Sequence, residues 1–126
     1  IYYEAIRTGS YECFLSEHTA LPMLFMPDAI QATIQLMEAD RSRLSIHSAY
    51  NLGGMSITPD QVCQEIRKEI PDFSISYKPD FRQAIADTWP QSVDDSQACK
   101  DWECTQNYDL ERMSVIMLKK IRNKLK

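Results

Sequence analysis

The sequence predicts a mixed fold of the α/β or α+β class, in which short strands and helices share one chain. Segments with apolar residues at every third or fourth position indicate helices, and shorter segments with apolar residues at every second position indicate strands. The chain has 126 residues, 44% of them hydrophobic and 25% charged. This size and composition suit a single globular domain.

The first third of the chain predicts two helices with extended segments between them. Residues 2–7 are helical in character and stop at Gly9, a common C-terminal cap. Residues 11–15 predict a short strand, and the apolar run 21–26 is too short for a helix, so a strand or a buried loop fits. Residues 27–38 predict an amphipathic helix. The residues on its apolar face are Ile30, Ile34 and Met37.

The middle of the chain predicts a strand, a helix and a second strand. Residues 45–51 alternate between apolar and polar side chains, which indicates a strand. Thr58 and Gln61 have the spacing of a capping box, so a helix begins there and ends before Pro71. Residues 73–77 alternate again and predict a strand with one buried face.

The last third predicts three helical segments. Residues 81–87 form a helical turn or short helix, and Asp94 or Asp95 caps a helix that runs through Trp102. The last helix covers about residues 109–124, with acidic residues at its start and basic residues at its end, as the helix dipole favours. Its apolar stripe consists of Leu110, Met113, Met117 and Ile121.

Charge and hydropathy exclude several classes of protein. The formal charge of −4 provides no basic surface for nucleic acid. No apolar run approaches the roughly 20 residues that a membrane span needs, and no targeting segment leads the chain. The chain starts without Met and in the middle of a helical pattern, so we expect it to be a piece of a longer protein.

The four cysteines predict free thiols. Cys13, Cys63, Cys99 and Cys104 form no Cys-x-x-Cys pair, and the two histidines lie far from them in sequence. This spacing is unlike that of zinc sites, so no metal ligands are assigned. The apolar content allows a core without a disulfide framework.

Five segments carry a resemblance to a known family. They are Met26-Pro27-Asp28-Ala29-Ile30, Tyr50-Asn51-Leu52-Gly53-Gly54-Met55-Ser56, Thr58-Pro59, Pro71-Asp72-Phe73, and the stretch from Tyr77 to Trp102. In this order they resemble the C-terminal part of the L-threonine 3-dehydrogenases. These enzymes are extended short-chain dehydrogenases, similar to nucleotide-sugar epimerases. The resemblance covers essentially all of the chain.

The resemblance implies that residues 1–126 are the C-terminal substrate lobe of a longer, two-lobed dehydrogenase. The Rossmann lobe that binds NAD would be absent from this chain. Members of the family oxidise L-threonine to 2-amino-3-ketobutyrate, which 2-amino-3-ketobutyrate CoA ligase consumes. Family members in eukaryotes are mitochondrial homodimers.

Two features that this chemistry requires are missing from the sequence. The three glycines do not form the Gly-x-Gly-x-x-Gly turn that cradles the pyrophosphate of NAD. None of the six tyrosines is followed four positions later by the Lys that lowers the pKa of the catalytic phenol in the family. We therefore assign no catalytic and no cofactor-binding residue, and we expect the chain alone to be inactive.

Arg82 and Trp89 are the candidate substrate-binding residues. The corresponding lobe of sugar-nucleotide relatives helps clamp a phosphate or carboxylate with an Arg, and threonine brings a carboxylate that a guanidinium fork suits. Ion pairing of Arg82 with Asp80, Asp87 or Asp95 is the favoured alternative. Trp89 walls the pocket or simply packs beside Pro90. Asp94 and Asp95 fit a helix cap better than an acid/base pair.

The chain departs from the family after Trp102. A Gly and an aromatic residue are expected there, but Glu103 and Cys104 stand instead. Glu adopts a positive φ angle less readily than Gly, which predicts a strained turn. Two alternatives to a dehydrogenase lobe therefore remain: a truncated, non-catalytic homologue, or a lobe like that of a nucleotide-sugar epimerase.

Overall fold

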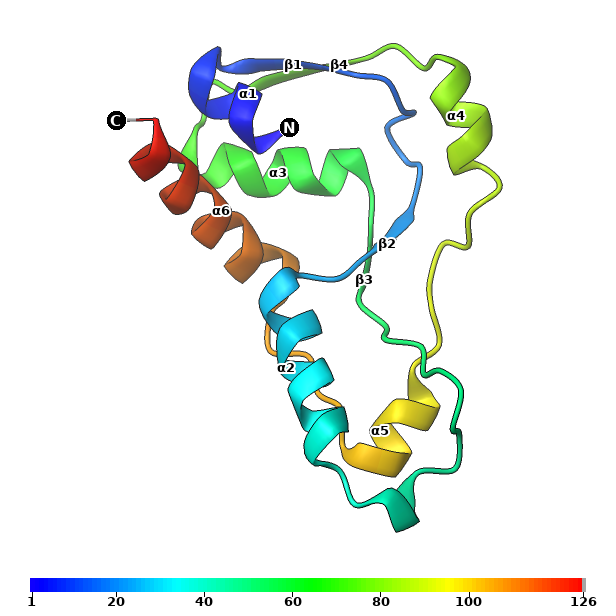
Figure 1. Ribbon diagram of the computed structural model, residues 1–126. Helices are drawn as coiled ribbons and strands as arrows, with labels where there is room; N and C mark the ends of the chain where they lie inside the picture. The colour runs from blue at the N-terminus through cyan, green and yellow to red at the C-terminus, as the bar shows by residue number, and fades with distance from the viewer. Residues whose placement is uncertain (126) are drawn as a thin grey trace.

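The computed structural model describes residues 1–125 and confirms the mixed α/β class (Figure 1). No helix in this part of the chain is long and apolar enough to span a membrane. In chain order the elements are α1 (Tyr2–Arg7), β1 (Ser10–Cys13), β2 (Leu21–Met23), α2 (Met26–Glu38), the short 3₁₀ helix η1 (Arg41–Arg43), β3 (Met55–Ile57), α3 (Pro59–Glu69), β4 (Ser74–Tyr77), α4 (Phe81–Ala86), α5 (Ser96–Trp102) and α6 (Leu110–Lys124).

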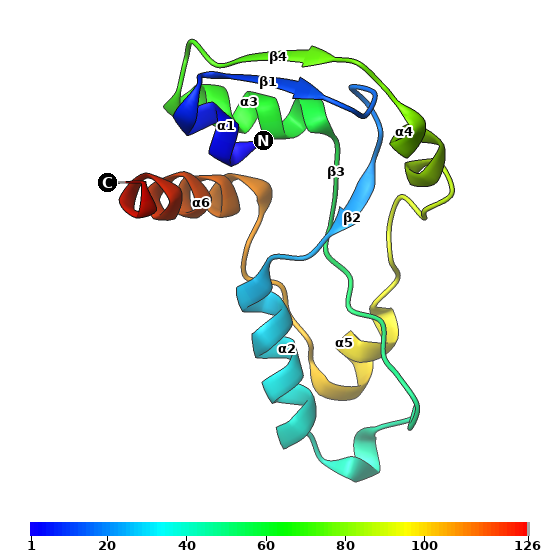
Figure 2. The ribbon, with the colours of Figure 1, turned by 45° about the horizontal axis from the view of Figure 1, so that its top comes forward.

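Two small sheets connect segments that are distant in sequence. β1 and β4 pair in parallel, from Ser10 opposite Ser74 to Cys13 opposite Tyr77. β2 and β3 pair antiparallel, with Leu21 opposite Ile57. Figure 2 shows β1 and β4 over α3 on one side of the molecule, with α2 and α5 at the opposite end and β2 and β3 between the two parts.

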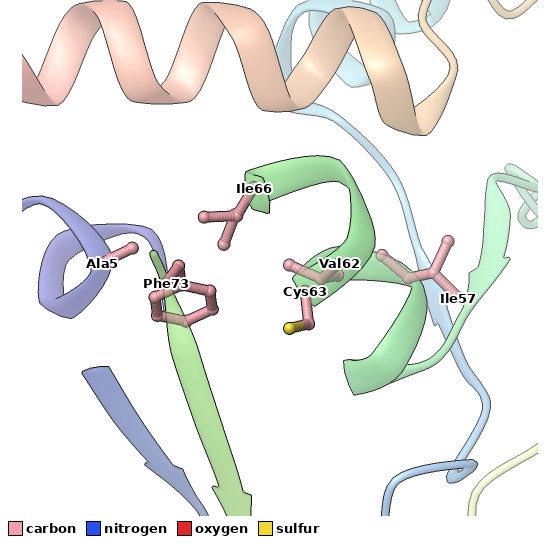
Figure 3. Close-up of a cluster of buried hydrophobic side chains, with 6 residues drawn as sticks. All are labelled: Ala5, Ile57, Val62, Cys63, Ile66 and Phe73. Atoms are coloured by element: carbon pink, nitrogen blue, oxygen red, sulfur yellow. The ribbon is translucent and has the colours of Figure 1, made fainter. Parts of the chain in front are cut away.

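The first hydrophobic core lies between α1, α3 and the β1–β4 pair. Its members come from α1, β3, α3 and the start of β4, and α6 packs Leu110 and Met113 against it. Cys63 and Ile66 of α3 are fully buried, so α3 is the central element of this part. The six buried residues are Ala5, Ile57, Val62, Cys63, Ile66 and Phe73 (Figure 3).

The predicted capping box of α3 is confirmed. The Oγ1 of Thr58 accepts a hydrogen bond from the amide of Gln61, at 3.3 Å, and the Oε1 of Gln61 accepts one from the amide of Thr58, at 2.9 Å. Two amides that a helix start leaves without partners are thereby satisfied. The other predicted helices also form, each within about two residues of its expected limits.

A second cluster joins α2 and α5. Ala32 of α2 packs with Ala98 and Trp102 of α5 and with Cys104, and Tyr50 stacks on Trp102 with ring centroids 5.1 Å apart. A buried carboxylate completes this contact. Asp101 accepts hydrogen bonds from the Ser45 hydroxyl at 2.7 Å, the Tyr50 hydroxyl at 2.5 Å and the Gln97 amide at 2.8 Å. These bonds fix α5 against the segment that follows η1.

The strand predicted at residues 45–51 is wrong for this structure. A strand needs a neighbour with which its backbone can bond, and no other strand of residues 1–125 pairs with this segment. Side chains take up its amides instead. The Ser45 amide donates to Asp101 at 2.9 Å and the Ile46 amide donates to the Tyr50 hydroxyl at 3.1 Å.

The apolar face predicted for α2 is present but exposed. Ile30, Ile34 and Met37 are 54%, 43% and 81% exposed, and Met26 on the same side is 65% exposed. The opposite side of the helix buries the carboxylate of Asp28, which accepts hydrogen bonds from the amides of residues 107 and 108. α2 therefore turns its small and polar side inward, and its large apolar side chains remain without a cover in this part of the chain.

The turn after α5 has the positive φ angle that the sequence predicted. Glu103 lies in the left-handed region, with φ 60° and ψ 36°, and its amide donates to the Cys99 carbonyl at 3.1 Å. Glycine adopts this conformation without a steric penalty, whereas other residues pay roughly 1 kcal/mol. The exposed ion pair between Glu103 and Arg43, at 3.0 Å, returns little of that cost.

Replacing Glu103 by Gly removes this strain. We expect Glu103→Gly to raise the free energy of unfolding by about 0.5–1 kcal/mol in urea denaturation. Glu103→Gln is the matched control, because it loses the ion pair and keeps the strained φ. If the Gly variant is no more stable than the Gln variant, the left-handed conformation of Glu103 does not cost the protein stability.

Stability should fall at acid pH because of Asp101. The hydroxyl groups of Ser45 and Tyr50, which donate to Asp101, hold the pKa of its carboxyl far below the usual range. A carboxyl whose pKa is depressed by folding adds stability above its unfolded pKa of about 4, and the gain is lost as pH falls below that value. Urea unfolding from about pH 6 to about pH 3 should show Asp101→Asn less stable than the parent sequence at pH 6, with the gap closing toward pH 3. If the free energies of unfolding of the two proteins fall in parallel over this pH range, the Asp101 carboxylate is not the cause of the acid destabilisation.

Candidate functional site

A cavity of about 350 Å³ lies between β1, β2, the start of α3 and α4. Most of its wall is apolar, and no Lys, His, Asp or Glu is among its lining residues in the described part of the chain. Both residues singled out from the sequence, Arg82 and Trp89, line it. The apolar side chains facing them include Tyr11, Phe14, Leu21, Met23, Ile57 and Val62.

The parallel sheet brings Arg82 to the cavity. Beyond β1 and β4 the two segments stay hydrogen-bonded. The Lys78 amide donates to the Cys13 carbonyl at 2.8 Å, and after a shift of one residue in the pairing the Asp80 amide donates to the Phe14 carbonyl at 3.3 Å. Arg82 follows in the first turn of α4. Its guanidinium carbon lies 3.5 Å from the centre of the Phe14 ring, a cation–π contact.

Asp80 holds the same guanidinium. The Arg82 Nε donates to Oδ1 of Asp80 at 3.0 Å and Nη2 donates to Oδ2 at 2.6 Å. Asp80 also caps α4, because its Oδ1 accepts from the Arg82 amide at 2.9 Å. These hydrogen bonds lower the pKa of the Asp80 carboxyl and raise the pKa of Arg82. The favoured alternative from the sequence, an ion pair with Asp80, is therefore confirmed. The substrate-binding role of Arg82 stays a prediction.

Trp89 stands at the rim of the cavity. Its side chain is 57% exposed, and its amide ends the turn after α4 by donating to the Ala86 carbonyl at 3.0 Å. It also borders a second, polar cavity of about 330 Å³, lined by His18 and Asp87 among others. Trp89 therefore separates an apolar space from a polar one. Its role toward a substrate stays a prediction.

Gln83 is a structural residue of the site that sequence reasoning missed. Its Oε1 accepts from the Ser16 amide at 2.7 Å, and its Nε2 donates to Thr19 Oγ1 at 3.0 Å and to Asp87 Oδ1 at 2.6 Å. These bonds fasten α4, which buries no residue of its own, to the loop between β1 and β2. A single Gln in a short helix gives no pattern from which this role could be read.

The acidic pair Asp94–Asp95 lies at the start of α5, as the sequence favoured, with Asp95 at the N-cap position but without a capping hydrogen bond from its side chain. Asp94 Oδ1 accepts from the Ser96 amide at 3.0 Å, in the first turn of α5. Asp95 Oδ2 accepts from the Gly53 amide at 3.2 Å and so ties the 44–54 segment to α5. Neither lines the cavity. Within residues 1–125, no group of three or more His, Cys, Asp or Glu side chains is arranged to hold a metal ion.

Curated relatives from a bacterium and a mammal match nearly all of this chain. It is 45% identical over 125 residues to an uncharacterized epimerase/dehydratase of Staphylococcus haemolyticus, covering 98% of this chain and 39% of the relative. It is 42% identical over 119 residues to the mitochondrial L-threonine 3-dehydrogenase of Bos taurus, covering 94% of this chain and 32% of that enzyme. No family model matches the chain.

A solved structure has the same fold. The GalE-like L-threonine dehydrogenase of Cupriavidus necator, in its apo form, superimposes with a TM-score of 0.91 and 49% sequence identity. The match covers 95% of this chain and 43% of that one.

Fold and sequence together relate the chain to the epimerase/dehydratase class of proteins. More particularly, the chain is homologous to a C-terminal part of the L-threonine 3-dehydrogenases, as the motifs between residues 26 and 102 predicted. It spans roughly two fifths or less of the length of these relatives.

Proposed function

We propose that residues 1–126 are the substrate-side lobe of an NAD-dependent L-threonine 3-dehydrogenase. The single observation that carries the proposal is the cavity in which Arg82 and Trp89 meet. It lies on a fold shared with L-threonine dehydrogenases at 49% identity. The apolar wall suits the methyl group of threonine, and the guanidinium at its edge suits the carboxylate.

The glycines of this chain do not fit a cradle for NAD. A side chain at Gly53 would collide with the carboxylate of Asp95, and one at Gly54 would collide with the Met23 carbonyl. Both glycines therefore serve packing inside this lobe. Gly9 has φ 70° and terminates α1. NAD would be bound by a separate Rossmann lobe, which supplies the hydride acceptor.

The exposed face of α2 and the unpaired segment 45–51 are further arguments for a second lobe. An amphipathic helix followed by an alternating, extended segment is half of a unit that packs on a parallel sheet. In this chain Met26, Ile30, Ile34 and Met37 face outward, and residues 45–51 have no strand beside them in the described part of the chain. A sheet in another part of the same enzyme would satisfy both.

Within the complete enzyme, the residues of this lobe would bind and orient the substrate. Arg82 would hold the carboxylate through the guanidinium nitrogen that Asp80 does not use, and Trp89 would exclude water from the reacting carbon. The proton acceptor would come from the other lobe. The product would be 2-amino-3-ketobutyrate, for a CoA ligase to consume. The enzyme would be a homodimer, located in mitochondria if its source is eukaryotic.

The chain alone should neither bind NAD measurably nor oxidise threonine. Gly53 and Gly54 are used for internal packing, Gly9 for the turn after α1, and no tyrosine is followed four residues later by Lys. Calorimetric titration with NAD and an absorbance assay for NADH formation measure both properties. Saturable NAD binding, or NADH formation that requires threonine, would place the active site within this lobe and overturn the assignment.

In the complete enzyme, Arg82→Ala should raise KM for threonine about tenfold or more. Losing a charged hydrogen bond costs on the order of 1.5–3 kcal/mol. Arg82→Lys should recover only part of the loss, because Lys lacks the planar fork. NAD affinity should stay near that of the unmodified enzyme.

Asp80→Asn is the matched variant for this experiment. It removes the negative partner of Arg82 and leaves the guanidinium in place, so KM for threonine should stay level or fall. If Arg82 acts only as a structural bridge, both Arg82→Ala and Asp80→Asn lower the melting temperature and leave KM near normal. That pattern would end the substrate role of Arg82.

A further inference from the structure

The end of α5 places two cysteines next to each other. The helix closes with Glu103 in the left-handed conformation, and the Glu103 amide returns to the carbonyl of Cys99 at 3.1 Å. This type of helix end brings a residue of the last turn into contact with the residue just beyond the cap. Here those two positions are occupied by Cys99 and Cys104.

The two thiols differ in their surroundings. Cys99 is exposed, and its Sγ lies 3.2 Å from the backbone carbonyl oxygen of Cys104. The side chain of Cys104 is buried in the cluster with Ala32, Ala98 and Trp102. Burial raises the pKa of the Cys104 thiol, and the neighbouring Cys99 raises it further. The pair thus consists of one accessible sulfur and one protected sulfur at the same helix end.

We propose that Cys99 and Cys104 form a dithiol site that closes to an intrachain disulfide when it meets a small-molecule disulfide such as oxidised glutathione. The other cysteines, Cys13 and Cys63, are both buried and lie in β1 and α3, away from α5. All four cysteines are free in this structure. This structure holds the reduced form of the site, and the disulfide would be its oxidised form.

The exchange runs in two balanced steps. The Cys99 thiolate attacks one sulfur of oxidised glutathione, forms a mixed disulfide and releases one glutathione thiolate. The Cys104 thiolate then attacks the Cys99 sulfur, forms the protein disulfide and releases the second glutathione. Two protein thiols are oxidised and one glutathione disulfide is reduced to two glutathione thiols. Because burial disfavours the Cys104 thiolate, the second step accelerates as pH rises.

The disulfide would act on residues that hold the second cluster together. Asp101 and Trp102 lie inside the ring that it closes, and these residues bind Ser45 and Tyr50. The cross-link reduces the conformational freedom of the unfolded chain around this point, and in the folded chain it holds the left-handed turn at Glu103 in place. The oxidation state of the pair therefore sets how firmly the segment after η1 is held to α5.

Peptide mapping of the folded chain tests the proposal. The chain is incubated with oxidised glutathione, its remaining thiols are alkylated, and it is digested with trypsin without reduction. Trypsin cleaves after Lys100, between the two cysteines, so residues 83–100 and 101–112 leave as separate peptides unless a disulfide joins them. We expect the joined pair, lighter by two hydrogens than the sum of its parts, and we expect dithiothreitol to separate it.

Two further measurements make the result decisive. Cys99→Ser changes only an exposed thiol and should fold normally, give no joined peptide and leave Cys104 reduced. The oxidised parent chain should have a higher urea midpoint than its reduced form, whereas the variant should show no such shift.

Two outcomes would overturn the proposal. One is a glutathione adduct that remains on Cys99 while Cys104 is alkylated after unfolding. The other is a joined peptide that forms only when the chain is oxidised in urea, because the folded geometry would then play no part.

Discussion

The parallel pairing of β1 with β4 is the contact on which the candidate site depends. It joins the start of the chain to its middle, and its register places Phe14 beside Asp80 just beyond the strands, where the pairing shifts by one residue. Because Arg82 follows Asp80 by two residues, the same register decides that the guanidinium lies over the Phe14 ring. A shift of one residue would turn every side chain of β4 to the other face and would remove Arg82 from the cavity.

Buried carboxylates organise the other end of the molecule. Asp28 receives the amides that precede α6, and Asp101 receives the hydroxyl groups of Ser45 and Tyr50. A buried charge is costly unless it is hydrogen-bonded, so each carboxylate specifies one arrangement of the segments around it. The apolar contacts of this end are few, which makes these directional bonds correspondingly important. The two ends of the molecule are thus held by different interactions, one by an apolar core and the other by polar networks around Trp102, which stacks on Tyr50.

Local signals in the sequence were sufficient for the helices. Thr58 and Gln61 cap α3 through hydrogen bonds to each other, and at the start of α6 Asp109 accepts a hydrogen bond from the Arg112 amide. Both interactions lie within one helical turn. Residues 45–51 show the limit of such signals. An alternating pattern identifies the side chains that share a face, but a strand also needs a second strand with which its backbone can form hydrogen bonds. The stripe on α2 shows a related limit, because periodicity identifies an apolar face without stating what covers it.

The candidate site was likewise predictable only in part. Arg82 and Trp89 became candidates through the resemblance and both line the cavity, and the pairing of Arg82 with Asp80 follows from their closeness in sequence. Gln83 was missed because its partners at residues 16 and 19 come near only after the parallel sheet has formed. The predicted strain at Glu103 was found because the residue type itself conflicts with the required φ angle.

The open segment between η1 and β3 affects how long such a chain would persist in a cell. Its backbone bends at His47 and Ser48 and pairs with no strand of residues 1–125, and side chains bond its amides at Ser45, Ile46 and Gly53. Proteases bind substrates as extended strands, and exposed connections of this kind are where they cut most readily. Arg41 and Arg43 stand just before it. Any cover over this segment would therefore protect the protein from degradation.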